Sequence, residues 1–189
     1  MTLVATPSQT VGPFFHIGCS KLTVAEMAGA NVPGARVTIE GRILDGQRTP
    51  VPDAMIEIWQ ANASGKYADH ADSQGKPPDR EFKGYGRVAT DRNGRFAFAT
   101  IKPGAVPGPG NTIQAPHLAI SIFMRGLLKR LISRIYFPDE SANGGDFVLN
   151  SVNPARRKTL IARKSENSAE TVLWDVILQG KDETVFFDI

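Results

Sequence analysis

The chain has a single cysteine, Cys19, so an internal disulfide is impossible and a reducing compartment is its natural setting. It also lacks any apolar run close to the roughly 18 residues that a membrane-spanning helix needs. Its first residues lack the basic segment followed by an apolar segment that is typical of a secretory signal. We therefore expect a cytoplasmic protein that does not associate with membranes.

A strong charge excess is missing too, because the formal net charge is only +3. Basic residues cluster at 156–158 and 163–164, but no recognisable nucleic-acid module accompanies them. A cluster of this size usually forms one solvated face of a helix, so we expect no nucleic-acid partner. The clustered Cys/His spacing of a zinc site is also absent. The mild basic balance fits an anionic small substrate better than it fits nucleic acid.

Short segments that alternate apolar and polar residues dominate the rest of the chain. Residues 37–44 alternate and end at the turn signal Asp45-Gly46, and 87–90 and 95–99 flank the hairpin signal at 91–94. Further strands are expected at 55–59, 117–123, 131–137, 171–178 and 184–189. Seven or so short strands with turn signals between them predict a mainly β fold, either an antiparallel β-sandwich or a partly open barrel with long loops.

The N-terminal part differs in composition, and we divide the chain into an N-terminal arm and connecting segment at 1–34 and a β-sandwich domain at 35–189. Up to about Phe15 the sequence is rich in Thr, Ser, Pro and Gly without any period, which is typical of a flexible arm. Glycine and proline also argue against regular structure at 105–112. One short helix is predicted near 154–163, with asparagine at 153 as N-cap and proline at its first position.

Several motifs resemble those of the intradiol ring-cleaving dioxygenases. They are Glu57-Ile58-Trp59-Gln60-Ala61-Asn62, Gly65-Lys66-Tyr67, Ile101-Lys102-Pro103-Gly104 and Ala115-Pro116-His117. The opening segment at 6–15 is similar to the arm of the α subunit in those family members that are built from two kinds of chain. The resemblance implies an antiparallel β-sandwich of the intradiol dioxygenase type, and O2-dependent cleavage of a catechol ring.

In that family ferric iron is bound by two tyrosinates, two histidines and a hydroxide, and phenolate oxygen suits this hard ion. The resemblance puts Tyr67 and His117 at two of the four ligand positions, and Val106 and Ala119 at the other two. Valine and alanine have no lone pair to donate. We therefore expect Tyr67 and His117 to be relict ligand positions, with no metal site and no catalytic residue on this chain.

Two further positions near the relict ligands depart from the family pattern. The arginine that usually stands three residues before the first histidine is replaced by Gln114. Arg134 lies where iron-bearing relatives carry a glutamine, and we expect it to have a structural role.

The resemblance implies a non-iron α subunit that lines the substrate pocket of an iron-bearing β subunit, which holds the Fe(3+). The two chains would form a heterodimer that assembles into a higher symmetric oligomer. A small aromatic carboxylate and O2 would be the substrates. The residues expected to bind the organic substrate are Thr10, Gly12, Pro13, Phe14 and Arg125.

Each of these side chains suits its role. The Arg125 guanidinium can grip a carboxylate with two parallel hydrogen bonds. Gly12 lets the backbone approach a flat ring, Pro13 stiffens that approach, and Phe14 offers apolar surface where many relatives have tyrosine. Thr10 can supply a hydroxyl.

Two alternatives stay open. The first is a non-catalytic β-sandwich that serves as a binding or scaffold protein. The second is a self-sufficient iron dioxygenase with replacement ligands, for which the candidates are His16, His70, Asp69 and Asp72.

Overall fold

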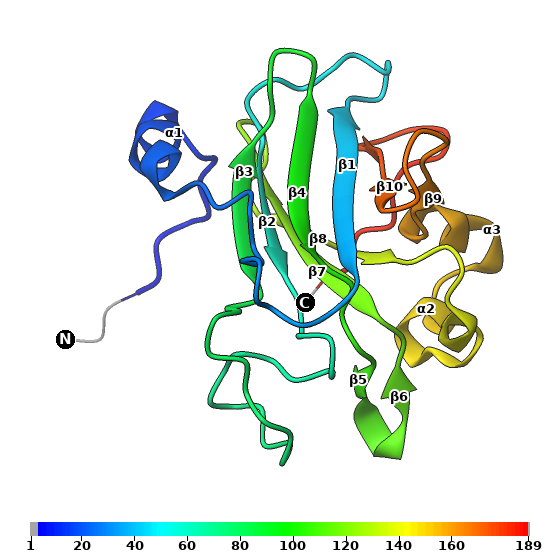
Figure 1. The fold of residues 1–189 in the computed structure, drawn as a ribbon. Coiled ribbons are helices and arrows are strands. Elements are labelled where there is room, and N and C mark those ends of the chain that lie inside the picture. The colour runs from blue at the N-terminus through cyan, green and yellow to red at the C-terminus, as the bar shows by residue number, and fades with distance from the viewer. Residues whose placement is uncertain (1–3, 189) are drawn as a thin grey trace.

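Two β-sheets packed face to face form the centre of the protein in the computed structural model, which describes residues 4–188 (Figure 1). The first sheet contains β1 (Arg36–Leu44), β4 (Arg95–Ile101), β9 (Arg163–Lys164), β10 (Thr171–Leu173) and β11 (Val176–Ile177). The second has the order β3 (Tyr85–Ala89), β2 (Met55–Trp59), β7 (His117–Phe123) and β8 (Leu131–Tyr136). A small hairpin of β5 (Val106–Pro107) and β6 (Ile113–Gln114) extends from the sandwich.

The predicted mainly β, largely antiparallel sandwich is confirmed. The β1–β10 and β1–β11 pairs are parallel, so the first sheet is mixed. The predicted strands at 37–44, 55–59 and 117–123 match β1, β2 and β7 to within one residue. Each has the alternating pattern because one of its faces lies against the other sheet.

The hydrophobic core lies between the two sheets. Its most deeply buried side chains come from both inner faces and are Ile39, Ile43, Phe98, Ile101, Ile56, Ile58, Leu118, Ile120, Ile122 and Ile135. A second, smaller cluster packs beside β8, and its members are Ala115, Tyr136, Leu149, Val152, Leu160 and Val185.

The helices differ from the prediction of one short helix near 154–163. The structure has three short α-helices, α1 (Pro13–Cys19), α2 (Phe147–Ser151) and α3 (Pro154–Arg157), within the described residues. The predicted start of α3 is confirmed, with the Asn153 side chain accepting a hydrogen bond from the amide of Ala155 at 3.0 Å. Its predicted end was wrong, because a 3₁₀ turn, η4 (Lys158–Leu160), replaces the remaining helix. Other 3₁₀ turns are η1 (Ser20–Leu22), η2 (Pro109–Asn111) and η3 (Ser141–Gly145).

The N-terminal arm also differs from the prediction of an irregular segment up to about Phe15. Residues 4–12 have no regular structure, but α1 begins at Pro13, so the irregular arm ends before Phe15. Proline at the first helical position is the signal that could have revealed this helix. Figure 1 shows α1 beside β3, on the side of the sandwich opposite to α2 and α3. None of the helices within residues 4–188 has the length and apolar character needed to cross a membrane.

Two strands near the C-terminus were predicted wrongly. The strand predicted at 171–178 is interrupted between β10 and β11, because the Asp175 carboxylate accepts the Arg42 amide at 3.0 Å in place of a backbone carbonyl. At this point the Trp174 carbonyl approaches Gly41 so closely that a Cβ there would lie 1.9 Å from the oxygen. The strand predicted at 184–189 does not form within the described residues, where Phe187 makes one isolated bridge to Ile132; Ile189 lies outside them.

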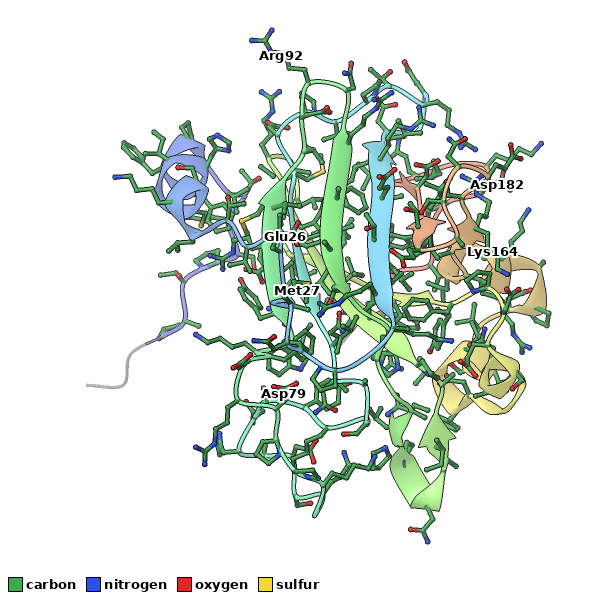
Figure 2. The ribbon with its side chains drawn as sticks, viewed as in Figure 1. Glu26, Met27, Asp79, Arg92, Lys164 and Asp182 are labelled. Carbon is green, nitrogen blue, oxygen red and sulfur yellow. The ribbon has the colours of Figure 1, made fainter. Side chains whose placement is uncertain are left out.

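The connecting segment before β1 closes the edge between the two sheets. Val24 bridges Arg87 of β3, and Glu26 bridges Ala99 of β4. Figure 2 shows Glu26 and Met27 beside these strands, and Met27 is buried. The segment at 105–112, where regular structure was not expected, contains β5 and η2.

Candidate functional site

The outer face of the second sheet carries both groups of residues that the sequence singled out. Alternation puts Glu57 and Trp59 of β2 on this face, while Ile56 and Ile58 point into the core. Cross-strand register extends the face, because residues directly opposite each other in neighbouring strands share it. Trp59 stands opposite Ala119 of β7.

All four relict ligand positions are linked at one end of this face. Ala119 is paired with Trp59 on one side and with Arg134 of β8 on the other. The Trp59 ring stacks on the Tyr67 ring, with centroids 5.9 Å apart and 9° between the planes. Val106 pairs with Gln114 across the β5–β6 hairpin, and His117 begins β7. We call this group the relict cluster.

Tyr67 and Val106 share a cavity of about 470 Å³, which Trp59, Pro107 and the loop at 69–74 also line. Burial raises the pKa of the Tyr67 phenol, although the positive charge of Arg134 opposes the rise. The phenol is therefore protonated at neutral pH and is not a tyrosinate. Tyr67 is held in place by its own amide, which donates to the Asp72 carboxylate at 2.8 Å.

Asp72 organises the loop beside this cavity. Burial by itself would raise the pKa of its carboxyl group, but hydrogen bonds from the Tyr67 and Gln74 amides and from the Lys66 ammonium outweigh burial and lower the pKa to about 2. The Lys66 Nζ lies 3.1 Å from Oδ1. Because the carboxylate oxygens of Asp72 already accept these donors, the structure gives it a structural role and not that of a replacement ligand.

His117 is buried, and its Nδ1 lies 2.7 Å from the Ala115 carbonyl oxygen. A carbonyl can only accept, so Nδ1 carries the proton and Nε2 carries the lone pair. Burial and the nearby Arg134 charge lower the pKa of His117 to about 4. The retained histidine is thus a neutral imidazole.

Arg134 and Gln114 are hydrogen-bonded to each other, with 2.7 Å between Nη1 and Oε1. The same Nη1 lies 3.4 Å from the Tyr136 hydroxyl. These are the two positions where the family resemblance places arginine at 114 and glutamine at 134. This chain has the two residue types exchanged, so a guanidinium stands on β8 directly beside Ala119.

The residues present do not fit ferric iron. Two of the four positions have no donor atom, and the positive charge of the Arg134 guanidinium, which acts on both Tyr67 and His117, would repel a metal ion. Among the described residues, no three His, Cys, Asp or Glu side chains are grouped so that they could hold a metal. Of the histidines considered as replacement ligands, His16 lies in α1, and His70 lies in the loop after Tyr67 with a side chain that is 98% exposed.

The buried His117 makes stability depend on pH. Its pKa is about 4 in the folded chain, compared with an ordinary value of 6.5, so the unfolded chain binds the proton first as the pH falls. The stabilisation is fully present above pH 6.5 and is lost as the pH falls towards 4. We expect a loss on the order of 3 kcal/mol across this window, measured by urea unfolding. The charged groups that act on the ring are Arg134 and Asp146.

A His117→Gln variant is the control for this prediction, because glutamine keeps a polar side chain but does not titrate. Its free energy of unfolding should fall less between pH 6.5 and 4 than that of the parent chain. An equal fall in both proteins would contradict the assignment to His117.

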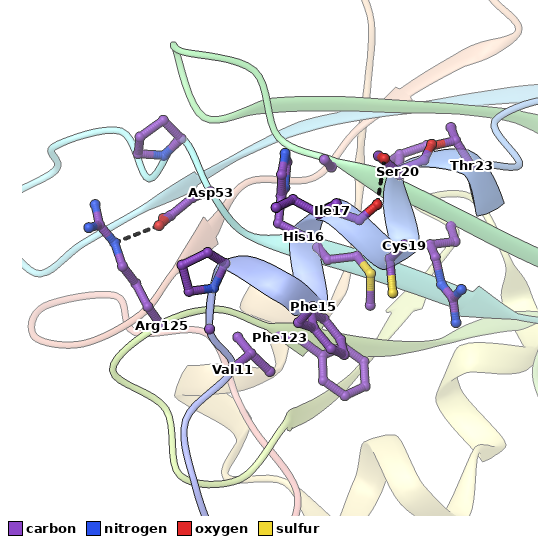
Figure 3. Close-up of a pocket in the computed structure, with 17 residues that line it drawn as sticks. Val11, Phe15, His16, Ile17, Cys19, Ser20, Thr23, Asp53, Phe123 and Arg125 are labelled. Atoms are coloured by element: carbon purple, nitrogen blue, oxygen red, sulfur yellow. Dashed lines mark hydrogen bonds and ion pairs between the residues drawn. The ribbon is translucent and has the colours of Figure 1, made fainter.

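A second cavity, of about 530 Å³, lies at the other end of the same face, beneath α1 (Figure 3). Gly12, Pro13 and Arg125, three of the five residues predicted to bind substrate, line it. Phe15 and Phe123 form an aromatic pair in its wall, with centroids 5.7 Å apart and 38° between the planes. The arm and the turn after β7 are thus brought together although they are far apart in the sequence.

Thr10 is also at this place, where its hydroxyl contacts the backbone on both sides of Arg125. Phe14 does not line the cavity, and its side chain is 88% exposed. Phe15, and not Phe14, fills the position inside the cavity. We call Thr10, Gly12, Pro13, Phe14 and Arg125 the arm cluster.

Asp53 is a neighbour of Arg125 that sequence reasoning did not identify. Its Oδ2 lies 2.5 Å from the Arg125 Nε, and Figure 3 shows this ion pair at one end of the cavity. Within residues 4–188 the structure records no partner for the two Nη nitrogens of Arg125, whose side chain is 75% exposed. The guanidinium therefore presents a free two-nitrogen fork. No local motif signals Asp53, because it stands in an ordinary turn before β2.

A polar network occupies the middle of the face, between the two clusters. Glu57 accepts hydrogen bonds from the Tyr85 hydroxyl at 2.7 Å and from the Arg87 Nε at 2.8 Å, and Arg87 Nη2 contacts the same oxygen. Burial and the hydrogen bond to Glu57 raise the pKa of Tyr85 to about 12. The charges of Glu57 and Arg87 are paired within this network, which lies between the relict cluster and the arm cluster.

The two clusters lie at opposite ends of β7. β7 begins at His117 and ends at Phe123, just before Arg125. Its seven residues span roughly 20 Å at about 3.3 Å per residue. A single-ring substrate cannot touch both ends.

Comparison with known proteins identifies the family of this chain. A family model described as Dioxygenase matches residues 11–180. The protocatechuate 3,4-dioxygenase alpha chain of Burkholderia cepacia is 38% identical over 202 residues, covering 100% of this chain and 99% of that protein. The beta chain from the same organism is 34% identical, covering 94% of this chain and 77% of the beta chain.

Solved structures agree on the fold. The dioxygenase domain of a carbohydrate-binding fusion protein from Streptomyces sp. SirexAA-E superposes with a TM-score of 0.64 at 21% identity. The superposition covers 86% of this chain and 89% of that domain. The sandwich is therefore of the intradiol dioxygenase type, as predicted.

Proposed function

Because this chain belongs to the intradiol ring-cleavage dioxygenase family, we propose that it serves as the alpha-type, non-iron chain of a heteromeric protocatechuate 3,4-dioxygenase. The assembly cleaves protocatechuate with O2 between its two hydroxylated carbons and yields 3-carboxy-cis,cis-muconate. Ferric iron, held by a beta-type partner, supplies the activation of the catechol. The two chains form a heterodimer that assembles into a larger symmetric oligomer.

One observation carries this proposal: the arm cluster is assembled on the surface, at the opposite end of β7 from the relict cluster of the same chain. Substrate-binding groups at that end have no function toward their own relict pocket. They do have one if the surface beneath α1 faces the iron pocket of another chain.

Within that pocket four residues of the arm cluster have distinct contacts. The free Nη fork of Arg125 binds the substrate carboxylate with two charge-assisted hydrogen bonds. Gly12 and Pro13 bring the backbone and an apolar ring against the aromatic substrate. The exposed Phe14 ring packs at the contact with the partner chain. This chain therefore contributes recognition, and proton and redox chemistry belong to the partner.

Purification of this chain alone and of the chain co-expressed with a beta-type partner tests the proposal. The lone chain should be colourless and contain no stoichiometric iron. The complex should have the brick-red colour of tyrosinate-to-iron charge transfer and cleave protocatechuate. Stoichiometric iron in the lone chain would favour the self-sufficient enzyme, and failure to associate with any iron-bearing chain would favour the scaffold protein.

A further inference from the structure

Thr10 contacts the turn that carries Arg125, and not the cavity. Its Oγ1 accepts a hydrogen bond from the amide of Gly126 at 2.7 Å, and its hydroxyl is directed at the carbonyl oxygen of Met124 at a longer 3.5 Å. The two backbone partners flank Arg125 in the sequence. One side chain of the arm therefore holds the backbone on both sides of the arginine.

The turn that carries Arg125 is closed by one backbone hydrogen bond, from the Leu127 amide to the Met124 carbonyl oxygen at 3.3 Å. Gly126 has a φ of +91°, which a residue with a side chain rarely adopts. Arg125 itself is 75% exposed, and its one recorded side-chain contact among the described residues is the Asp53 ion pair. An exposed ion pair holds a side chain only weakly. The position of the guanidinium thus depends on the backbone that Thr10 fixes.

We propose that Thr10 is a positioning residue for Arg125: by fixing the Met124–Gly126 turn, it sets where the guanidinium fork meets the substrate carboxylate. This inference rests on the proposed function and deepens it. It assigns Thr10 a role in selecting carboxylated catechols, in place of the direct hydroxyl contact with substrate that the sequence suggested.

The test uses the heteromeric complex with a Thr10→Val variant, which keeps the shape of threonine and removes the hydroxyl. Loss of one hydrogen bond to an already ordered turn should raise the KM for protocatechuate roughly threefold to tenfold. The kcat should change little, because the two hydroxylated carbons that react lie away from the carboxylate that Arg125 binds. The inhibition constant of catechol, which has no carboxylate, should be unchanged. Thr10→Ser restores the hydroxyl and should restore the KM.

A double-mutant cycle separates positioning from a direct contact. If Thr10 acts through Arg125, adding Thr10→Val to Arg125→Ala should not raise the KM beyond that of Arg125→Ala alone. Additive effects, an equal change for catechol, or a Thr10→Val variant with the parent KM would each overturn the inference while leaving the proposed function intact. An unchanged KM in Arg125→Ala would instead refute carboxylate binding at this surface, and the inference with it.

Discussion

Replacing Arg125 with alanine in the complex is expected to raise the KM for protocatechuate by roughly 10-fold to 100-fold. The side chain presents its two Nη nitrogens without a recorded partner among residues 4–188, while Asp53 engages only Nε. A hydrogen bond to a charged group contributes about 1.5–3 kcal/mol, and each 1.4 kcal/mol corresponds to a tenfold change in affinity. Steady-state kinetics with protocatechuate measures the effect, and the kcat should change much less than the KM.

Two further variants make this result specific. Arg125→Lys keeps the positive charge but loses the planar fork, so its KM should lie between those of the parent and the alanine variant. Arg130→Ala removes another exposed arginine from the same connection between β7 and β8, and its KM should be that of the parent. A parent-like KM in Arg125→Ala would exclude carboxylate capture by this chain.

The strands were predictable because the alternation of apolar and polar residues reports burial directly. Ile56 and Ile58 are completely buried, and Glu57 between them lies on the outer face, as the pattern requires. Alternation predicted the strand at 171–178 wrongly, because it carries no information about side chains that replace backbone hydrogen-bond partners. Asp175 does this at the break between β10 and β11.

The arm was harder to predict, because its order depends on contacts with residues far away in the sequence. Composition alone favours a flexible tail at 1–15, yet Thr10 is tied to Gly126, and Phe15 packs on Phe123. Gly12 and Pro13, which the family motif singled out, line the cavity beneath α1. The motif did not show that the Phe15 ring, and not that of Phe14, faces the cavity.

The relict cluster differs, because the residue types at single positions carry the prediction there. Valine at 106 and alanine at 119 already excluded two donors. The hydrogen bond between Arg134 and Gln114 could not be foreseen, because the two residues are 20 positions apart and meet only through the β6 and β8 strands. Together they put a positive charge beside Ala119.

The largest expected loss of stability comes from Asp146, which is completely buried beside the relict cluster. Its carboxylate accepts hydrogen bonds from the Tyr136 hydroxyl at 2.9 Å, the Leu149 amide at 2.7 Å and the Ala115 amide at 2.8 Å. Asp146→Ala would leave three buried donors without their acceptor and remove the N-cap of α2. Since each buried unpaired group costs about 1–3 kcal/mol, we expect a loss of about 3–5 kcal/mol.

Urea unfolding of the purified chain at pH 7 measures this loss, and three variants define its origin. Tyr136→Phe removes a single donor, so it should cost about 1 kcal/mol and leave the other two hydrogen bonds intact. Asp146→Asn keeps one acceptor oxygen, so its loss of stability should lie between those of Asp146→Ala and Tyr136→Phe. Asp139→Ala removes an exposed carboxylate whose partner is Lys164, and should change stability by less than about 0.5 kcal/mol. If Asp146→Ala cost no more than Asp139→Ala, then Asp146 would not hold together α2, β6 and β8, the elements that position the relict cluster.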